Sequence, residues 1–177
     1  MQHASTPLCR FLLRDKKNWE TKAHEEAEGF AVSHPDAFCV LESGAKGMGL
    51  FATQFVPKGT YLFDYTGELL SQAQYDRRYP NRISDYCAAM RNPATGEMHF
   101  VDGIDEVLGH PSRWMNHDDR RPNVGRRSFF PTEPGAKPRI LMYALRDLNV
   151  GDELQWSYGE GYWRAHQDMG MTKIETE

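Results

Sequence analysis

Short β-prone segments separated by turn-forming residues constrain the fold of this chain more than any other feature of its sequence. Its 177 residues include 15 glycines and 10 prolines, and many of these stand between runs of strand-forming residues. The strongest predicted strand covers 139–148, and a Gly-Asp turn then leads into a final strand that ends at Tyr158. Other strands are predicted over 37–43, within 44–53, over 56–70 and over 98–103. No internal repeat is visible, so the pattern predicts a mostly β domain built from several small sheets.

Few segments have the pattern of a helix. Residues 14–29 are dense in Lys, Glu and Ala, and they predict a surface helix that ends near Gly29. Residues 71–80 begin with a serine N-cap and end at a proline, which predicts a short helix. Residues 110–117 predict a helical turn, and a short helical tail is expected at the C-terminal end. The length of the chain fits one domain with one core.

The charge of the chain and its cysteine and histidine spacing exclude several classes of protein. The net charge is −4, so any basic surface for nucleic acid must be local. No apolar run is long enough to span a bilayer, and residues 1–20 carry charges on both sides of a brief apolar patch, unlike a signal peptide. The three cysteines are widely spaced, without a CxxC pair, and the histidines lack HxxxH or HExxH spacing. We therefore expect reduced thiols, an intracellular protein and no metal site.

A local cluster of basic residues lies in the second half of the chain. Its members are Arg120, Arg121, Arg126 and Arg127, in a segment with the composition of a loop. Such a cluster can meet DNA phosphates or an acidic partner. A solvated loop is the simpler interpretation, because Asp118 and Asp119 offset part of the charge. Direct binding of nucleic acid is therefore expected to be weak or absent.

Four segments in a fixed order carry a resemblance to a known family. They are GMGLFA (47–52), YTGE (65–68), RWMNH through PN (113–123) and ALRDLNVGDELQWSYG (144–159). In this order and spacing they resemble the SET domain, the fold of most protein lysine methyltransferases. The resemblance covers residues 38–163 and implies a β-clip-like SET fold with a knot-like, threaded C-terminal segment. Residues 1–37 are then a helical flanking segment, and residues 164–177 are a short tail.

The resemblance implies that the chain binds S-adenosylmethionine. In SET proteins the glycine-rich turn, here Gly47, Met48 and Gly49, binds this cofactor through backbone groups, and Lys46 is adjacent. From the glycines alone, a tight turn between strands is the simpler interpretation, and the turn lacks the third glycine and the βαβ unit of a Rossmann fingerprint. The resemblance extends the cofactor site to Arg113, Asn116 and His117, and Tyr162 and Trp163 are added as candidates from their position after the last strand. Without it, the Asn-His pair indicates a helix-end cap, and the last two aromatics indicate packing within the tail helix.

Tyr158 is the catalytic residue that the resemblance implies. The reaction is in-line transfer of a methyl group from a sulfonium to a lysine amine. A free lysine has a pKa of about 10.4, so the amine must first lose its proton, and burial among aromatic side chains lowers the pKa of an ammonium. Positioning and desolvation then supply much of the catalysis, and a phenol can hold the amine in line. The alternative for Tyr158 is a core tyrosine with a satisfied hydroxyl group.

Four aromatic residues are candidates for the walls of the substrate lysine channel: Tyr65, Tyr86, Tyr143 and Trp156. Aromatic rings suit an alkylammonium because they are apolar yet present negative π-faces. Tyr65 matches a family position near the target lysine, whereas Tyr86 and Tyr143 fit a plain core almost as well. SET enzymes often have Phe or Tyr where this chain has Trp156, two residues before Tyr158. Tryptophan there either narrows the channel toward fewer methyl groups or packs elsewhere.

The chain also departs from many histone-directed SET enzymes, which bind zinc through a cysteine after the Asn-His motif and a cysteine-rich tail. Here Asp118 and Asp119 follow the motif, and the tail has no cysteine. Another element must therefore cover the cofactor and the peptide groove. Tyr162 and Trp163 are placed to stack on adenine or to close the channel.

These features together predict an S-adenosylmethionine-dependent protein lysine N-methyltransferase. Its expected substrate is a histone or another basic protein tail, which suits the acidic balance of the chain. The expected location is nuclear, on chromatin, in a eukaryote, and cytoplasmic otherwise. The alternative is a catalytically inactive SET-like module that binds a protein partner or chromatin; Trp156 and the missing zinc module favour it.

Overall fold

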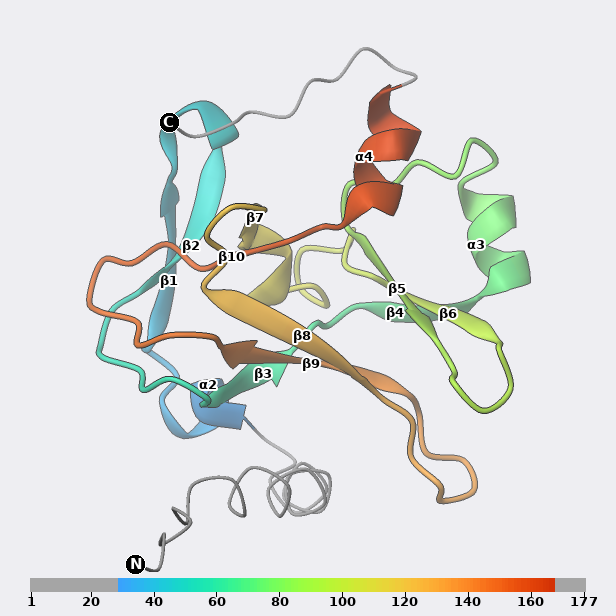
Figure 1. Cartoon of the computed structure of the whole chain (residues 1–177), viewed down its shortest axis with the longest axis horizontal. Coiled ribbons are helices and arrows are strands. Elements are labelled where there is room, and N and C mark those ends of the chain that lie inside the picture. The colour runs from blue at the N-terminus through green and yellow to red at the C-terminus, as the bar shows by residue number, and fades with distance from the viewer. Residues whose placement is uncertain (1–28, 168–177) are drawn as a thin grey trace, which may run out of the picture.

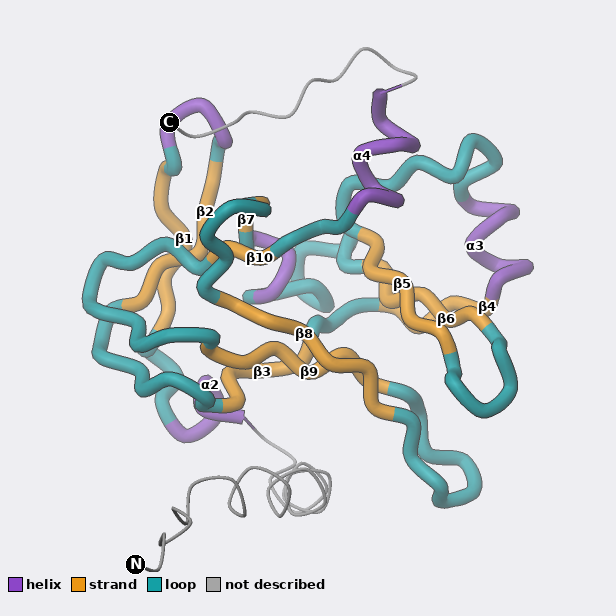
Figure 2. Tube along the Cα trace, viewed as in Figure 1, coloured by secondary structure: helices purple, strands orange, loops and turns teal. Residues whose placement is uncertain are grey.

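The computed structural model describes residues 29–167, and within them the strands form four small sheets (Figures 1 and 2). The strands are β1 (Phe38–Glu42), β2 (Met48–Ala52), β3 (Tyr61–Asp64), β4 (Glu68–Ser71), β5 (Cys87–Arg91), β6 (Met98–Asp102), β7 (Asn116–His117), β8 (Val124–Phe129), β9 (Arg139–Ala144) and β10 (Gln155–Trp156). The helices are α2 (Gly29–Ser33), α3 (Gln72–Arg78) and α4 (Glu160–Gln167), with 3-10 turns η1 (Gly44–Lys46) and η2 (Ser112–Trp114). The predicted mostly β architecture is confirmed.

The sheets are simple in topology. β1 and β2 form an antiparallel hairpin, and β3, β9 and β8 form an antiparallel sheet with β9 in the centre. β4, β6 and β5 form a second antiparallel sheet around β6. The last sheet is a short parallel pair, in which β10 lies beside β7. Figure 1 shows this pair near the middle of the molecule, between the hairpin and the two larger sheets.

One hydrophobic cluster joins the sheets. Alternate residues of β9, namely Ile140, Met142 and Ala144, lie in this core, as expected where a strand presents one face to it. Trp156 from β10 belongs to the same cluster. A smaller cluster of Leu70, Tyr75 and Phe100 packs α3 onto the β4–β6–β5 sheet. No helix among residues 29–167 is long and apolar enough to cross a membrane.

The helix predicted over 71–80 is confirmed as α3. Ser71 is its N-cap and exchanges hydrogen bonds with Gln74 in a capping box, because the serine hydroxyl accepts from the Gln74 backbone and the Gln74 side chain accepts from the Ser71 backbone. The helical turn predicted over 110–117 shortens to η2. The helix predicted over 14–29 lies outside the described residues except for Gly29, which begins α2.

The single strand predicted over 56–70 is wrong in its length, because the chain turns between β3 and β4. Gly67 has a φ of 152°, and a Cβ atom built on it would lie 2.2 Å from the carbonyl oxygen of Asp102. Only a residue without a side chain fits here, so the backbone of 65–67 leaves one sheet and enters the other. The segment predicted as one strand therefore forms two strands, β3 and β4, which belong to different sheets.

Two predictions near the C-terminal half also need correction. Arg126 and Arg127 lie in β8 and not in a loop, because β8 pairs with β9 along its whole length. The strand predicted over 139–148 ends at Ala144, and Leu148 instead forms an isolated bridge with Val56. The final strand is only two residues long, since its only sheet partner among the described residues is the equally short β7.

The close approach at Gly67 generates a stability test. We expect Gly67→Ala to lower the free energy of unfolding by about 3 kcal/mol or more, because the new methyl group overlaps backbone atoms and the φ is unfavourable for alanine. Gly135→Ala is the matched control, since Gly135 also has a positive φ, of 84°, but no neighbour within 4 Å of a built Cβ. Urea denaturation followed by tryptophan fluorescence measures both, and equal losses would contradict the steric explanation.

Candidate functional site

The parallel pairing of β10 with β7 builds the centre of the site. It places Trp156 opposite His117 and brings the next residues of the chain past the η2 turn. The backbone N–H of Tyr158 donates to Nδ1 of His117 over 3.1 Å. The Tyr158 hydroxyl donates to the carbonyl of Met115 over 2.8 Å. Tyr158 is thus fixed at its backbone and at its phenol by the segment that contains the Asn-His pair.

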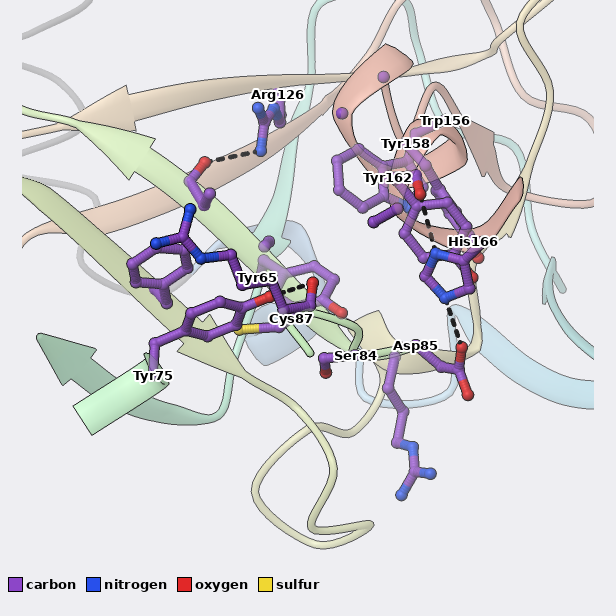
Figure 3. A pocket seen from close by; sticks show the side chains of 18 of the residues that line it. Tyr65, Tyr75, Ser84, Asp85, Cys87, Arg126, Trp156, Tyr158, Tyr162 and His166 are labelled. Atoms are coloured by element: carbon purple, nitrogen blue, oxygen red, sulfur yellow. Dashed lines mark hydrogen bonds and ion pairs between the residues drawn. The ribbon is translucent and has the colours of Figure 1, made fainter. Parts of the chain in front are cut away.

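A pocket of about 290 Å³ opens on one side of Tyr158 (Figure 3). Its walls come from β3–β4, β5, the turn before β5, η2, β8, β10 and α4. The lining residues are Tyr65, Tyr75, Arg82, Ser84, Asp85, Cys87, Ala88, Ala89, Phe100, Arg113, Met115, Arg126, Trp156, Tyr158, Gly159, Gly161, Tyr162, Ala165 and His166. Segments far apart in sequence therefore meet around this pocket, which makes it the strongest candidate for a substrate site.

Aromatic rings form one continuous wall of the pocket. The rings of Tyr65 and Trp156 are 5.7 Å apart between centroids, and those of Trp156 and Tyr158 are 5.3 Å apart. Trp156 is only 6% exposed and lies between the two phenols. Trp156 therefore lines the pocket and also packs in the hydrophobic core. The guanidinium of Arg126 lies over its ring, 5.5 Å from the centroid.

The two tyrosine hydroxyl groups of this wall both donate their protons to backbone carbonyls. Tyr65 donates to the carbonyl of Tyr86 over 2.9 Å, as Tyr158 does to that of Met115. Burial, and then the nearby phenol of Tyr158, raise the pKa of Tyr65, and burial followed by the phenols of Tyr162 and Tyr86 raises that of Tyr158. Both phenols therefore remain neutral over the physiological pH range. Each oxygen has its proton engaged and keeps lone pairs for a ligand that can donate.

Three arginines line the pocket, and two of them, Arg113 and Arg126, make contacts that fix their charge in the walls. Arg126 donates to the carbonyl of Ala89 over 3.0 Å, and burial lowers its pKa. Arg113 is 8% exposed, and its guanidinium lies 4.2 Å from the ring centroid of Tyr86 and 4.8 Å from that of Trp114. Arg113 was predicted among the cofactor contacts, but the structure places it in the pocket wall. Arg126 was predicted in a basic loop cluster, and it too belongs to the wall.

The predicted cofactor turn meets the Asn-His pair that contacts Tyr158, and five of the predicted residues gather there. Gly47 has a φ of 77°, and a Cβ built on it would meet nothing within 4 Å, so the turn is open to its surroundings. The ammonium of Lys46 donates to the carbonyl of His117 over 3.2 Å. The side-chain amide of Asn116 donates to the carbonyl of Met48 over 3.0 Å. The turn and the Asn-His pair are thus one unit, although 68 residues separate Met48 and Asn116 in the sequence.

Glu153 holds this unit together, and sequence reasoning did not single it out. One of its carboxylate oxygens accepts from the Ser43 hydroxyl and from the Asn116 amide, both over 2.7 Å. The other accepts from the Gln155 amide over 2.7 Å. A Cβ built on Gly49 would lie 2.6 Å from the same carboxylate, so glycine is needed to let Glu153 approach. A glutamate next to an aspartate in a turn gives no sequence signal for such a position.

The aromatic residues after β10 pack around His117 and Tyr158. Trp163 Nε1 lies 3.1 Å from His117 Nε2, and the two rings meet edge to face with their centroids 4.8 Å apart. The ring of Tyr162 meets that of Tyr158 at 4.8 Å. Both α4 aromatics, predicted as a lid or as tail packing, therefore lie against the centre of the site.

Two of the four predicted channel residues do not line the pocket. Tyr143 points away from the core face of β9 and packs on Gly125 of β8, where a built Cβ would lie 2.7 Å from the tyrosine ring. The alternation of β9 is the cause, since Met142 and Ala144 take the core side. Tyr86 lies behind the wall, where its carbonyl holds Tyr65 and its phenol helps to raise the pKa of Tyr158.

Asp85 and His166 are further pocket residues that sequence reasoning missed. They face each other across the pocket, with Asp85 before β5 and His166 on α4. A single aspartate in a loop and a single histidine in a tail helix carry no spacing signal, since 81 residues separate them. Within residues 29–167, no three His, Cys, Asp or Glu side chains are grouped so that they could hold a metal ion.

Comparison with known proteins gives a consistent result. The family model of the SET domain matches residues 47–159. Histone-lysine N-methyltransferase EHMT1 of Homo sapiens is 31% identical over 117 residues, which are 66% of this chain and 9% of that protein. Histone-lysine N-methyltransferase SETMAR of Mus musculus is 27% identical over 141 residues, which are 77% of this chain and 44% of that protein. The chain thus spans less than half the length of these curated relatives.

A solved structure shows the same fold. The crystal structure of CpSET8 from Cryptosporidium aligns with a TM-score of 0.60 and 20% sequence identity, and the alignment covers 81% of this chain and 66% of that one. At this identity the likeness concerns the fold alone. The domain limits of 38–163 enclose the matched residues and remain a prediction.

The position of Glu153 generates a second stability test. We expect Glu153→Ala to lower the free energy of unfolding by about 3 kcal/mol, because three side-chain donors lose their acceptor. Glu160→Ala is the control, since Glu160 is exposed on α4, and its loss should cost less than about 0.5 kcal/mol. Urea denaturation compares the two variants with the unmodified protein. A loss at Glu153 no larger than at Glu160 would show that the carboxylate does not hold the turn.

Proposed function

The chain belongs to the SET-domain family, and from that premise we propose that it transfers methyl groups from S-adenosylmethionine to a lysine side chain of a protein. One observation carries the proposal. Tyr65 and Tyr158 line the same pocket, and each has its hydroxyl proton engaged by a backbone carbonyl. The phenol oxygens therefore offer lone pairs, and the rings around them offer π-faces. An alkylammonium or its amine suits both groups.

The pocket also favours the neutral amine that the reaction needs. A free lysine ammonium has a pKa of about 10.4, and removal from water lowers it. The guanidinium groups of Arg113 and Arg126 lie in the same walls, and like charges lower it further. Because Tyr158 stays neutral, its role is to accept a hydrogen bond from the amine and direct the nitrogen lone pair, and not to remove the proton. Water at the pocket mouth accepts the proton that the lysine ammonium loses.

The residues of the turn and of the Asn-His pair fit the proposed cofactor. The open turn at Gly47 offers backbone groups, Lys46 offers an ammonium for a carboxylate, and Asn116 offers an amide with both donors and an acceptor. Tyr162 and Trp163 supply aromatic surface next to His117. These residues would hold S-adenosylmethionine, with Met48, Gly49 and His117 contributing to the same unit. When bound, the cofactor would supply a methyl group on a sulfonium, and that group would pass to the amine nitrogen as the carbon–sulfur bond breaks and a neutral thioether leaves.

We propose a histone or another basic protein tail as the substrate. The curated relatives EHMT1 and SETMAR are named histone-lysine N-methyltransferases, which supports this class. The net charge of −4 also suits a basic partner. A nuclear location on chromatin in a eukaryote, or a cytoplasmic one otherwise, is proposed on the same basis.

A cofactor titration separates this function from the alternative of an inactive binding module. Isothermal calorimetry with S-adenosylmethionine should give saturable binding, and Glu153→Ala should weaken it because Asn116 loses its anchor. Absence of binding at high micromolar cofactor would favour the inactive module.

Tyr158→Phe tests the catalytic assignment. We expect a loss of about 100-fold in kcat/KM, because one preorganised polar group at the reacting centre is removed while the ring is kept. Cofactor affinity should change little, since the backbone N–H of residue 158 still donates to His117. Transfer of labelled methyl groups to histones and to a panel of basic proteins measures the rate. Equal activity in the variant and the unmodified protein would remove Tyr158 from the mechanism.

Trp156→Phe tests what limits the number of methyl groups. The indole lies between Tyr65 and Tyr158, where a methylated amine must fit. We therefore expect the protein to add few methyl groups per lysine and the variant, with its smaller ring, to add more. Mass spectrometry of one substrate peptide after exhaustive reaction gives the distribution. Phe63→Leu, a core change outside the pocket lining, controls for general loosening.

A further inference from the structure

A buried histidine closes the pocket from the side of α4. His166 is 1% exposed, and its Nδ1 lies 2.8 Å from the carbonyl oxygen of Tyr162 (Figure 3). Its Nε2 lies 3.0 Å from a carboxylate oxygen of Asp85. A carbonyl and an ionised carboxylate can only accept, whereas a neutral imidazole carries a single N–H. With Asp85 ionised, both contacts are satisfied together only when His166 is an imidazolium.

This pair connects α4 to the opposite wall of the pocket. The ring of Tyr162 stacks on His166, with centroids 3.9 Å apart, and meets the ring of Tyr158 at 4.8 Å. Asp85 lies on the turn before β5, so the ion pair joins the two sides of the opening. A continuous row of ring contacts thus runs from Tyr158 through Tyr162 to His166. The Asp85 carboxylate binds the His166 end of this row.

We propose that Asp85 and His166 are a positioning pair, here called the α4 clasp, which holds Tyr162 against Tyr158 while His166 carries both ring protons and releases α4 when it loses one. The link to catalysis rests on the proposed function. The clasp itself does not, because its state can be measured without any substrate.

The sign of the pH effect follows from the contacts. An imidazolium that gains a carboxylate partner stabilises the closed arrangement while it is protonated, and this contribution is lost as the pH rises. With one proton left on Nδ1 for the Tyr162 carbonyl, the Nε2 lone pair faces the Asp85 carboxylate and is repelled. The clasp is therefore closed while His166 carries both ring protons, and it opens as the pH rises and one of them is lost.

The other titratable groups that line the pocket keep their charge near neutral pH. Burial raises the pKa of Cys87 to about 12, and burial followed by the Asp85 carboxylate raises that of Tyr162 to about 12. Burial likewise raises the pKa of Tyr65, Tyr75 and Tyr158. His166 is the histidine of this lining, and both of its ring nitrogens face oxygen acceptors.

Nitrogen NMR of the histidine rings tests the clasp directly in the full chain. His166, assigned by the loss of its signals in His166→Gln, should carry protons on both ring nitrogens at about pH 6 and on Nδ1 alone at about pH 9. A single ring proton on His166 at about pH 6 would overturn the proposal. This measurement uses the unmodified protein for its conclusion, so it does not depend on how well a variant folds.

Asp85→Asn gives the second test, because its amide can serve either state of the ring. The amide N–H₂ donates to a neutral Nε2 at high pH, and the amide oxygen accepts from the imidazolium at low pH. In the unmodified protein, amide hydrogen exchange of α4, corrected for intrinsic rates, should be about tenfold faster at about pH 9 than at about pH 6. In Asp85→Asn this difference should vanish, whereas Glu160→Gln on the same helix should keep it. An unchanged difference in Asp85→Asn would contradict the clasp.

Methyl transfer then shows whether the clasp matters for activity. In the unmodified protein, the rate of methyl transfer should rise with pH as the substrate lysine loses its proton, and it should fall at higher pH, where α4 is released. In Asp85→Asn the fall should be absent. If exchange and NMR show the clasp but no methyl transfer is found, the proposed function fails and the clasp stands. If the rate of methyl transfer depends on alkaline pH in the same way in the unmodified protein and in Asp85→Asn, the clasp does not position the pocket for catalysis.

Discussion

The two-residue parallel pairing of β10 with β7 is the constraint on which the rest of the site depends. It sets Gln155 beside Asn116 and Trp156 beside His117. Every later contact of the site follows from this register, because Glu153 comes within reach of the Asn116 amide and Tyr158 within reach of the Met115 carbonyl. A strand pair this short has little stability of its own. It is held by buried side chains from both larger sheets, so the site is an outcome of the global fold.

The polarity of the pocket has a simple physical origin. Backbone carbonyls of the turns that border it use up the phenol protons, and burial keeps both phenols neutral. What remains is an aromatic wall whose polar groups accept but do not donate, next to arginines that disfavour a second cation. Such a wall can hold an amine better than an ammonium. Turn geometry and not the number of tyrosines therefore decides the chemistry, since Tyr143 has the same phenol and takes no part.

The sequence predicts short segments and ordered motifs well, and it fails where contacts depend on distant chain segments. The serine N-cap at Ser71 and the strand predicted over 37–43 are local, and both were found. The break at Gly67 was missed because its cause is the Asp102 carbonyl in another strand. The candidate residues at Tyr158 and Trp156 came from a family resemblance over fifteen residues and not from periodicity. Glu153, Asp85 and His166 gave no signal, because single charged residues in turns and tails usually face water.

The C-terminal helix is the part of the site whose order depends most on the state of the site itself. The described part of α4 has eight residues, and a helix of this length is not stable alone in water. Its described anchors are aromatic contacts with Tyr158 and His117 and the ion pair with Asp85. Each anchor ends on a residue of the pocket or of the proposed cofactor unit. A ligand that orders Tyr158 or His117 must therefore also stabilise α4, and by reciprocity a docked α4 must favour that ligand.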